Sequence, residues 1–416
     1  MIEIKEEIEK FILIGVSLGD TFKNGKNQPD DTESSLEELK ELVATAGGET
    51  VGIMIQNREA VDKATYFGKG KVEELRLMVA ELGATGIVSD DELTPAQLGN
   101  LEDALDLKIC DRTQIILEIF AKHAQTREGK IQVELAQLKY RQSHLVGLGR
   151  SLSRQGGGIG TRGPGEKKLE TDRRLIRDRI SELNNELDNV VRTRDVTRAQ
   201  RIKANIPGVA IVGYTNAGKS TLLNTATGSS ELEADKLFAT LDPVVRELVL
   251  ENGQKVLMTD TVGFVRKLPH HLVDAFRSTL EEAKYSDIIL QTVDASDPDH
   301  EAQTEVTYET LDRLGIKGKT FITFFNKMDR LTDRDESLKD LRADYVIRGS
   351  AKTGEGLDEL KAVLDKIIKE KRNYIEKVFA FTEAGEIQKI RRNGQIISEE
   401  YMEDGIHIKA YVDRKE

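Results

Sequence analysis

Residues 207–223 read PGVAIVGYTNAGKSTLL and contain the spacing Gly213-x-x-x-x-Gly218-Lys219-Ser220. An apolar run of strand length precedes the glycines and a helix-like run follows them, which is the context that a phosphate-binding loop requires. The glycines permit the tight turn, and the helix that begins here turns its positive dipole end toward an anion. The stretch therefore predicts a strand–loop–helix unit in which Lys219 reaches the β- and γ-phosphates and the Ser220 hydroxyl ligates Mg²⁺.

A second polar cluster ends another predicted strand, in the sequence MTDTVGF. Asp260 can hold Mg²⁺ there, and the N–H group of Gly263 can meet the γ-phosphate. Between the two motifs lies LFATLDPVV, where we select Thr240 as a second Mg²⁺ ligand on a mobile switch. Thr225 and Thr227 are alternatives, but they lie too close to the helix that follows the phosphate loop.

The sequence NKMD at residues 326–329 follows the apolar strand TFITFF and indicates which base is bound. The Asp329 carboxylate can accept from two donors of guanine that adenine lacks, so we expect ATP to be rejected by roughly 10⁴-fold or more. Asn326 would brace the loop, the Lys327 stem would lie over the base, and the Ala351 N–H group could donate to guanine O6. These motifs disfavour a phosphate-loop kinase or an ATPase.

The order of these motifs is the G-domain pattern of translation-factor and Ras-like GTPases, and the resemblance covers residues 206–372. The predicted catalytic residues are Lys219, Thr240 and Gly263, and the predicted metal ligands are Ser220, Thr240 and Asp260. The predicted GTP-binding residues are Gly213, Tyr214, Thr215, Asn216, Ala217, Gly218, Lys219, Ser220, Thr221, Phe238, Ala239, Thr240, Leu241, Asp242, Asp260, Thr261, Val262, Gly263, Asn326, Lys327, Met328, Asp329, Ser350, Ala351 and Lys352.

One residue departs from the Ras-like pattern. Phe264 stands where Ras-like proteins place the glutamine that orients the attacking water. Phenylalanine cannot hold water by a hydrogen bond, so we expect slow hydrolysis unless a partner completes the site. No arginine finger can be assigned, and we interpret the nearby Arg266 as a solvated residue of a switch helix.

The N-terminal residues 1–112 alternate short apolar runs with helical patterns, which predicts a small α/β unit with a largely parallel sheet. The sequence FGKGK at 67–71 is expected to open a helix after a turn. Cys110 is the only cysteine, so disulfides are excluded and a reducing compartment fits. We expect Cys110 to be a small buried hydrophobic residue.

From residue 113 to 203 the strand patterns stop and two helical stripes predict an antiparallel helical hairpin. Its tip, RQGGGIGTRGPGE, contains Gly158-x-Gly160-x-x-Gly163, the spacing of a dinucleotide-binding fingerprint. That motif follows a helix instead of a strand, so we interpret the glycines as a slim tip. The stripes consist of Ile131, Leu135, Leu138 and Leu145, and of Ile176, Ile180, Leu183, Leu187 and Val190.

The charge of the chain is unevenly distributed. Residues 121–203 hold 19 Lys and Arg against 10 Asp and Glu, an excess of nine positive charges in a chain of net charge −12. Such a segment suits RNA phosphates, and Arg154 and Arg162 at the tip are candidate RNA contacts. The alternative is that the basic helix faces are merely solvated.

The whole chain resembles the bacterial HflX family, through YFGKGKVEEL, DRTQIILEIFAKHAQTREGKIQVELAQLKY, GGGIGTRGPGE and LFATLDP…DTVGFVRKLPHHLVDAFRSTLEE. The resemblance implies a cytoplasmic GTPase that binds the large ribosomal subunit, splits ribosomes under stress and inserts its hairpin near the peptidyl-transferase centre. An alternative is a ribosome- or RNA-binding module that GTP stabilises and hydrolysis only resets.

The predicted organisation has four parts: an N-terminal α/β domain (1–112), a helical hairpin (113–203), a G domain (204–372) and a small α+β appendage (373–416). The acidic start MIEIKEEIEK is unlike a signal peptide. No apolar run approaches the ~20 residues of a membrane span. We therefore expect a cytoplasmic protein without membrane insertion, and we expect a monomer.

Overall fold

The computed structural model describes residues 8–23, 26–28, 30–155, 164–203, 206–229, 237–238, 242–267, 277–331 and 338–413. The chain forms two compact units. The first contains residues 1–187 together with 266–275, and the second contains 188–265 together with 276–416. The short segment 266–275 therefore belongs to the first unit, although it directly follows the motif DTVGFV in the sequence.

A four-stranded parallel sheet in the order β4-β1-β5-β6 forms the centre of the first unit. β1 is buried along nearly its whole length because its two faces both pack against helices. Ile12 and Ile14 contact Leu75 and Leu101 on one side, and Gly15 lies against Leu36 on the other. The predicted small α/β unit is confirmed. Its elements are β1 (Lys10–Ser17), β2 (Thr21–Lys23), β3 (Lys26–Gln28), α1 (Thr32–Ala46), β4 (Glu49–Asn57), α2 (Lys69–Leu82), β5 (Gly86–Ser89), α3 (Pro95–Leu105) and β6 (Lys108–Asp111).

Local sequence explains where these helices begin. Gly68 is the N-cap of α2, which confirms the role expected for FGKGK. At α3 the side chain of Thr94 accepts from the Gln97 N–H group, and the side chain of Gln97 accepts from the Thr94 N–H group. These two hydrogen bonds form a capping box. Cys110 is buried in β6, and burial raises the pKa of its thiol to about 12, so it is an inert hydrophobic residue as expected.

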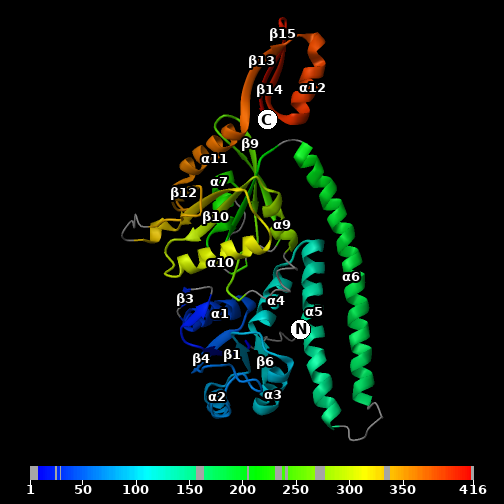
Figure 1. Ribbon diagram of the computed structural model, residues 1–416, viewed down its shortest axis with the longest axis vertical. Helices are drawn as coiled ribbons and strands as arrows, with labels where there is room; N and C mark the ends of the chain where they lie inside the picture. Colours follow the sequence, from blue (N-terminus) through cyan, green and yellow to red (C-terminus); the bar gives the residue numbers. More distant parts are fainter. Residues whose placement is uncertain are drawn as a thin grey trace, which may run out of the picture. The chain divides into compact units, whose positions relative to one another are not determined.

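Three helices follow β6: α4 (Arg112–His123), α5 (Arg127–Gln155) and α6 (Pro164–Lys203). Within the first unit α5 and the start of α6 run antiparallel (Figure 1), because Glu134 pairs with Arg179 at 2.8 Å while Arg127 pairs with Glu186 at 3.2 Å. Of the predicted stripes, Ile131, Leu135 and Leu183 are buried. The tip residues Gly158, Gly160, Arg162 and Gly163 lie outside the described residues, and Arg154 lies in the last turn of α5, with its side chain outside the description.

The second unit is built on a six-stranded sheet in the order β12-β11-β10-β7-β9-β8, in which only β8 runs antiparallel to its neighbour among the described strands. Helices α7 and α11 pack on one face, and α9 and α10 on the other (Figure 1). The elements are β7 (Gly208–Gly213), α7 (Lys219–Thr227), β8 (Val244–Val249), β9 (Lys255–Asp260), α9 (Arg277–Tyr285), β10 (Ile288–Asp294), α10 (His300–Arg313), β11 (Thr320–Asn326), η1 (Met328–Arg330), β12 (Tyr345–Arg348) and α11 (Leu357–Lys371).

The C-terminal residues form an antiparallel sheet in the order β13-β15-β14 with α12 packed against it. Ile387 and Ile390 of α12 contact Phe379, Ile406 and Ile408 of the sheet. The elements are β13 (Arg372–Phe379), η2 (Phe381–Glu383), α12 (Ala384–Asn393), β14 (Gly394–Met402) and β15 (Gly405–Asp413), which is the α+β architecture expected for this end of the chain.

Candidate functional site

The phosphate loop lies between a buried strand and a helix, as its sequence requires. Val209 to Val212 of β7 are at most 1% exposed, and α7 begins at Lys219. Gly218 has a φ of 90°, a left-handed conformation that favours glycine. A Cβ atom at Gly218 would also collide with the side-chain amide of Asn326, so the loop can close against Asn326 only with glycine at this position.

Lys219 is held inside the loop. Its side chain is 6% exposed, and its Nζ donates to the carbonyl oxygen of Tyr214 at 2.7 Å. Burial lowers the pKa of Lys219 to about 8, although the Asp260 carboxylate opposes that shift. A buried ammonium with so little solvation gains strongly from an anion beside it, which is the electrostatic property that a phosphate site needs.

Ser220 and Asp260 meet across the sheet edge. The Ser220 hydroxyl donates to an Asp260 carboxylate oxygen at 2.7 Å, where β9 ends beside the start of α7. A hydroxyl and a carboxylate are the hard oxygen ligands that Mg²⁺ prefers. Among the described residues no group of three or more His, Cys, Asp or Glu side chains could hold a metal ion.

The DTVGF segment continues from β9 along the phosphate loop. The Phe264 N–H group donates to the Gly213 carbonyl at 3.1 Å, and the Thr215 N–H group donates to the Phe264 carbonyl at 2.8 Å. A Cβ atom at Gly263 would lie 2.8 Å from both Lys219 Nζ and Thr215 Cα. Gly263 and Lys219, both predicted to meet the γ-phosphate, are thus side by side, with too little room for even a methyl group on that side.

Asn326 joins the phosphate end of the site to the base end. Its side chain is 2% exposed, and its amide nitrogen donates to the Ala217 carbonyl at 2.8 Å. Its amide oxygen accepts from the Ala351 N–H group at 2.8 Å. The expected bracing role therefore has a structural basis. The Ala351 N–H group, which the sequence predicts to donate to guanine O6, donates here to the side-chain oxygen of Asn326. Its donation to the base stays a prediction.

The carboxylate expected to select guanine lies at the surface. Asp329 is exposed in η1, and the Ser350 hydroxyl beside it lowers the pKa of its carboxyl group. The contact of Asp329 with guanine stays a prediction. Lys327 has a left-handed φ of 62° and pairs with Asp294 at 2.6 Å.

The predicted switch is only partly described. Phe238 is buried and Asp242 is half-buried, whereas Ala239, Thr240 and Leu241 lie outside the described residues. The role of Thr240 therefore stays a prediction. The two alternatives to it hydrogen-bond within their own helix, because the hydroxyls of Thr225 and Thr227 donate to the carbonyls four residues earlier in α7.

Three family matches cover most of the chain. Residues 33–121 match the family described as GTP-binding GTPase N-terminal, residues 123–201 match GTP-binding GTPase Middle Region, and residues 208–327 match 50S ribosome-binding GTPase. A GTPase HflX of Lacrimispora saccharolytica is 59% identical over 99% of this chain and 95% of its own length. The chain belongs to the HflX family of GTPases. The GTPase HflX of Escherichia coli is 42% identical over 80% of this chain and 78% of its own length.

A solved GTP-binding protein of Sulfolobus solfataricus in complex with GDP aligns with 86% of this HflX-family chain and 98% of its own, at 24% identity and a TM-score of 0.44. That likeness is too low to add to the assignment. As an HflX-family GTPase with a phosphate loop at the end of β7, the protein binds GTP and GDP and hydrolyses GTP to GDP and phosphate.

One interpretation of this HflX-family chain was wrong. Arg266 is not solvated: it is 8% exposed, belongs to the first unit, and donates to the Ser34 hydroxyl at 2.6 Å. The sequence reasoning also missed the buried residues around it, among them Asp90 and Arg112. A usable signal was present, because Asp90 and Arg112 each come two residues after an apolar run of strand length.

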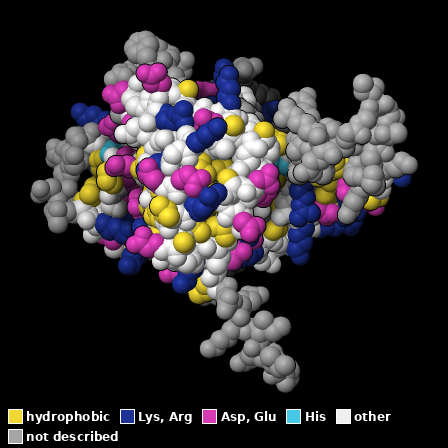
Figure 2. Space-filling view, turned by 90° about the horizontal axis from the view of Figure 1, so that it is seen from below, with side chains coloured by type: hydrophobic (Ala, Val, Ile, Leu, Met, Phe, Trp, Pro, Cys, Tyr) yellow, Lys and Arg dark blue, Asp and Glu magenta, His cyan; other side chains and the backbone are white. Residues whose placement is uncertain are grey.

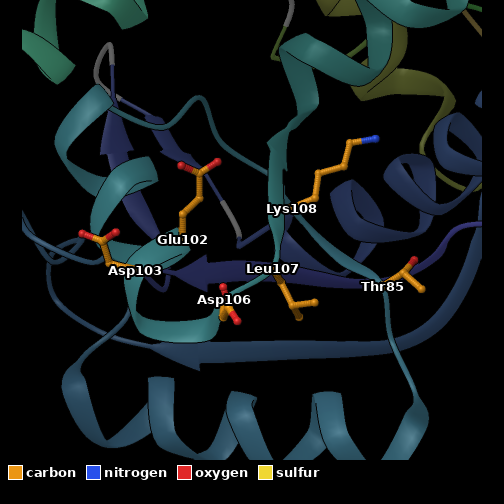
Figure 3. Close-up of a pocket in the computed structure, with 6 residues that line it drawn as sticks. All are labelled: Thr85, Glu102, Asp103, Asp106, Leu107 and Lys108. Carbon is orange, nitrogen blue, oxygen red and sulfur yellow. The ribbon is translucent and has the colours of Figure 1, made fainter. Parts of the chain in front are cut away.

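A hollow elsewhere in the first unit is lined by Thr85, Glu102, Asp103, Asp106, Leu107 and Lys108 (Figure 3). Thr85 precedes β5 and Lys108 begins β6, so the hollow lies at the amino ends of these parallel strands. Its predominantly acidic lining does not suit a phosphate.

Among the described helices of this HflX-family protein, none is long and apolar enough to cross a membrane.

Proposed function

We propose that this protein is a Mg²⁺-dependent GTPase that binds the large ribosomal subunit and splits ribosomes under stress. The observation that carries the ribosome part is the match of residues 208–327 to the family described as 50S ribosome-binding GTPase. We further propose that the protein acts as a monomer in the cytoplasm, where ribosomes lie. The predicted domain limits after residues 112, 203 and 372 are part of this proposal.

The nucleotide would lie along the carboxyl ends of β7, β9 and β11. Lys219 would neutralise charge on the β- and γ-phosphates, and the Gly263 N–H group would donate to the γ-phosphate. Asp329 would accept from guanine. Ser220 and Asp260, together with Thr240, would hold Mg²⁺, which when bound withdraws negative charge from the phosphate oxygens.

Hydrolysis by the isolated protein should be slow. Phe264 is 2% exposed, and its side chain offers no group that could orient water. Its backbone N–H and carbonyl groups are both engaged by the phosphate loop. The attacking water must then be placed by the backbone of Gly263, by Thr240 and by groups that the ribosome supplies. Each preorganised group of this kind typically changes kcat by about 10²–10³-fold.

The hairpin of α5 and α6 is the proposed ribosome-binding part. Its segment, residues 121–203, carries the positive excess of the chain, which matches the negative charge of RNA. On the face shown in Figure 2, by contrast, basic and acidic side chains are mixed among the residues drawn in colour. Arg154 and Arg162 remain the proposed RNA contacts at the tip.

The test measures GTP hydrolysis by the full chain alone, with large ribosomal subunits and with small subunits. We expect stimulation by the large subunit of at least about a hundredfold, because the ribosome completes the water-placing groups. Small subunits serve as the control for non-specific RNA effects. Equal rates with and without large subunits would contradict the proposal.

A second candidate is a binding module in which GTP is a structural ligand and hydrolysis only resets binding. The buried Phe264 favours it, because a site without a water-orienting side chain is better suited to holding GTP than to cleaving it. Ribosome splitting in a single round with a non-hydrolysable GTP analogue separates the two. Full splitting shows that hydrolysis serves release, and a requirement for turnover rejects the second candidate.

A further inference from the structure

Asp294 is a largely buried acidic residue that belongs to none of the nucleotide-binding motifs. It is the last residue of β10, and in the parallel register it lies opposite Asn326, the last residue of β11. Asp294 therefore stands at the carboxyl ends of the strands, directly beside the NKMD motif. Open parallel α/β sheets bind their ligands at this edge. Asp294 and the NKMD motif both belong to the second unit.

The two carboxylate oxygens of Asp294 have different partners. Its Oδ1 accepts from the Ser296 N–H group at 3.0 Å and from the Ser296 hydroxyl at 2.6 Å. Its Oδ2 lies 2.6 Å from Lys327 Nζ, and the side chains of both charged residues are only 14% exposed. The bonds to Ser296 hold the carboxylate in one orientation. Asp294 Oδ2 is therefore a fixed point to which the Lys327 ammonium attaches.

The backbone at Lys327 is held as well. Lys327 has a φ of 62°, a left-handed conformation that is unfavourable for a residue with a β-carbon. On one side of it the Asn326 carbonyl accepts from the Ala295 N–H group at 2.9 Å, and on the other the Met328 N–H group donates to the Gly349 carbonyl at 3.1 Å. These bonds keep the loop in its strained form. The Lys327 side chain is thus fixed at both ends, by its own backbone and by Asp294.

A lysine side chain that is fixed at both ends presents an ordered apolar stem. Lysine has one of the largest side-chain entropies to lose when it becomes ordered. Its methylene groups readily cover an apolar surface while the ammonium stays with a polar partner. Because the pair with Asp294 orders the stem before nucleotide arrives, a base that packs on it does not bear that cost.

We propose that Asp294 is a positioning residue for nucleotide binding, which holds Lys327 so that the lysine stem is ordered against the face of the purine base. The inference rests on the proposed placement of the Lys327 stem over the base. A stem packs on the face of any purine, so Asp294 should strengthen the binding of guanine and hypoxanthine nucleotides alike. Asp329, which would contact the base edge, should instead distinguish the two, because hypoxanthine lacks the N2 amino donor.

The test uses the full chain with Asp294→Asn. The amide keeps Oδ1 as the acceptor for Ser296, and it replaces Oδ2 with a donor that faces the Lys327 ammonium. Dissociation constants for GDP and inosine diphosphate are measured by isothermal titration calorimetry. We expect both affinities to fall about three- to tenfold, the usual cost of ordering one long side chain on binding. Their ratio should stay within about twofold of wild type, because the base edge is untouched.

GTP hydrolysis separates positioning from a general structural effect. A contact with the base is made equally in the ground state and in the transition state, so its loss raises KM and leaves kcat unchanged. In Asp294→Asn we therefore expect KM for GTP to rise about three- to tenfold, and kcat to stay within about twofold of wild type. A misfolded or loosened nucleotide site would lower kcat as well.

A second variant breaks the same pair from the other side. Lys327→Met removes the ammonium but keeps an apolar stem, so it should weaken GDP binding by a similar factor, and it tests the pair even if Asp294→Asn fails to fold. Adding Asp294→Asn to Lys327→Met should cause no further loss, because the carboxylate then has no ammonium to hold. Glu309→Gln is the matched control. It breaks an ion pair with Arg313 in which both side chains are at least half exposed, and GDP affinity should stay within about twofold of wild type.

The outcomes are distinct. GDP affinity in Asp294→Asn within twofold of wild type overturns the inference, and so does a changed ratio of GDP to inosine diphosphate affinity, a fall in kcat, or an additive loss in the double variant. A loss of GDP affinity in Lys327→Met without one in Asp294→Asn rejects only the positioning role of Asp294. Unchanged GDP affinity in Lys327→Met would instead contradict the placement of the Lys327 stem over the base.

Discussion

Asn326→Ala tests whether one buried amide assembles the nucleotide site. Asn326 makes two buried hydrogen bonds at 2.8 Å, one to the Ala217 carbonyl in the phosphate loop and one from the Ala351 N–H group. The alanine variant leaves both backbone groups without these bonds. A buried polar group that loses its partner typically costs about 1–3 kcal/mol, so the pair corresponds to roughly 2–6 kcal/mol.

This loss should be visible in two quantities. The free energy of unfolding of the nucleotide-free protein should fall by about 2–6 kcal/mol, measured by urea denaturation. GDP affinity should fall at least tenfold, measured by isothermal titration calorimetry, because the two loops must then be ordered at the expense of binding. The phosphate loop and the 350–352 loop are joined before nucleotide arrives, and the variant removes that preorganisation.

The control is Asn100→Ala. Asn100 donates one hydrogen bond, to the Ala64 carbonyl, at an exposed position in the first unit. Its removal should change neither quantity by more than about 1 kcal/mol, which is the net worth of an ordinary hydrogen bond. GDP affinity within twofold of wild type in a folded Asn326→Ala protein would refute the bridging argument, since the two loops would then need no connection.

Three further predictions follow from the site and the hairpin. Asp329→Asn places an amide donor where guanine also donates, so the affinity for GTP should fall at least about tenfold and the affinity for xanthosine triphosphate should rise. Unchanged GTP affinity in competition titrations would exclude the guanine contact. Burial lowers the pKa of Lys219 from 10.5 to about 8. Between these pH values the unfolded chain binds more protons than the folded chain, so the free energy of unfolding of the nucleotide-free protein should rise as the pH rises. Over the same window GDP should bind more weakly because the ammonium is lost, and calorimetry that finds equal GDP affinity from pH 7 to 9 would contradict a charged contact. Replacing Arg154 and Arg162 together with Gln should weaken co-sedimentation with large subunits and flatten its salt dependence while GTP affinity stays constant, whereas a lost GTP affinity would point to nucleotide binding at the tip.

The fold could be predicted where short-range sequence determines it. The phosphate loop is specified by seventeen consecutive residues, and its glycines and Lys219 lie where the motif requires. The parallel sheet of the first unit follows from alternating strand and helix patterns, and the start of α2 follows from Gly68. In each case the deciding contacts lie within one turn or one strand–helix unit.

The error arose where contacts are long-range. Arg266 was interpreted as solvated because it closely follows a switch motif. Its partner Ser34 lies 232 residues earlier, and Asp91 lies 176 residues before Lys267. No periodicity or spacing in the sequence could reveal these partners.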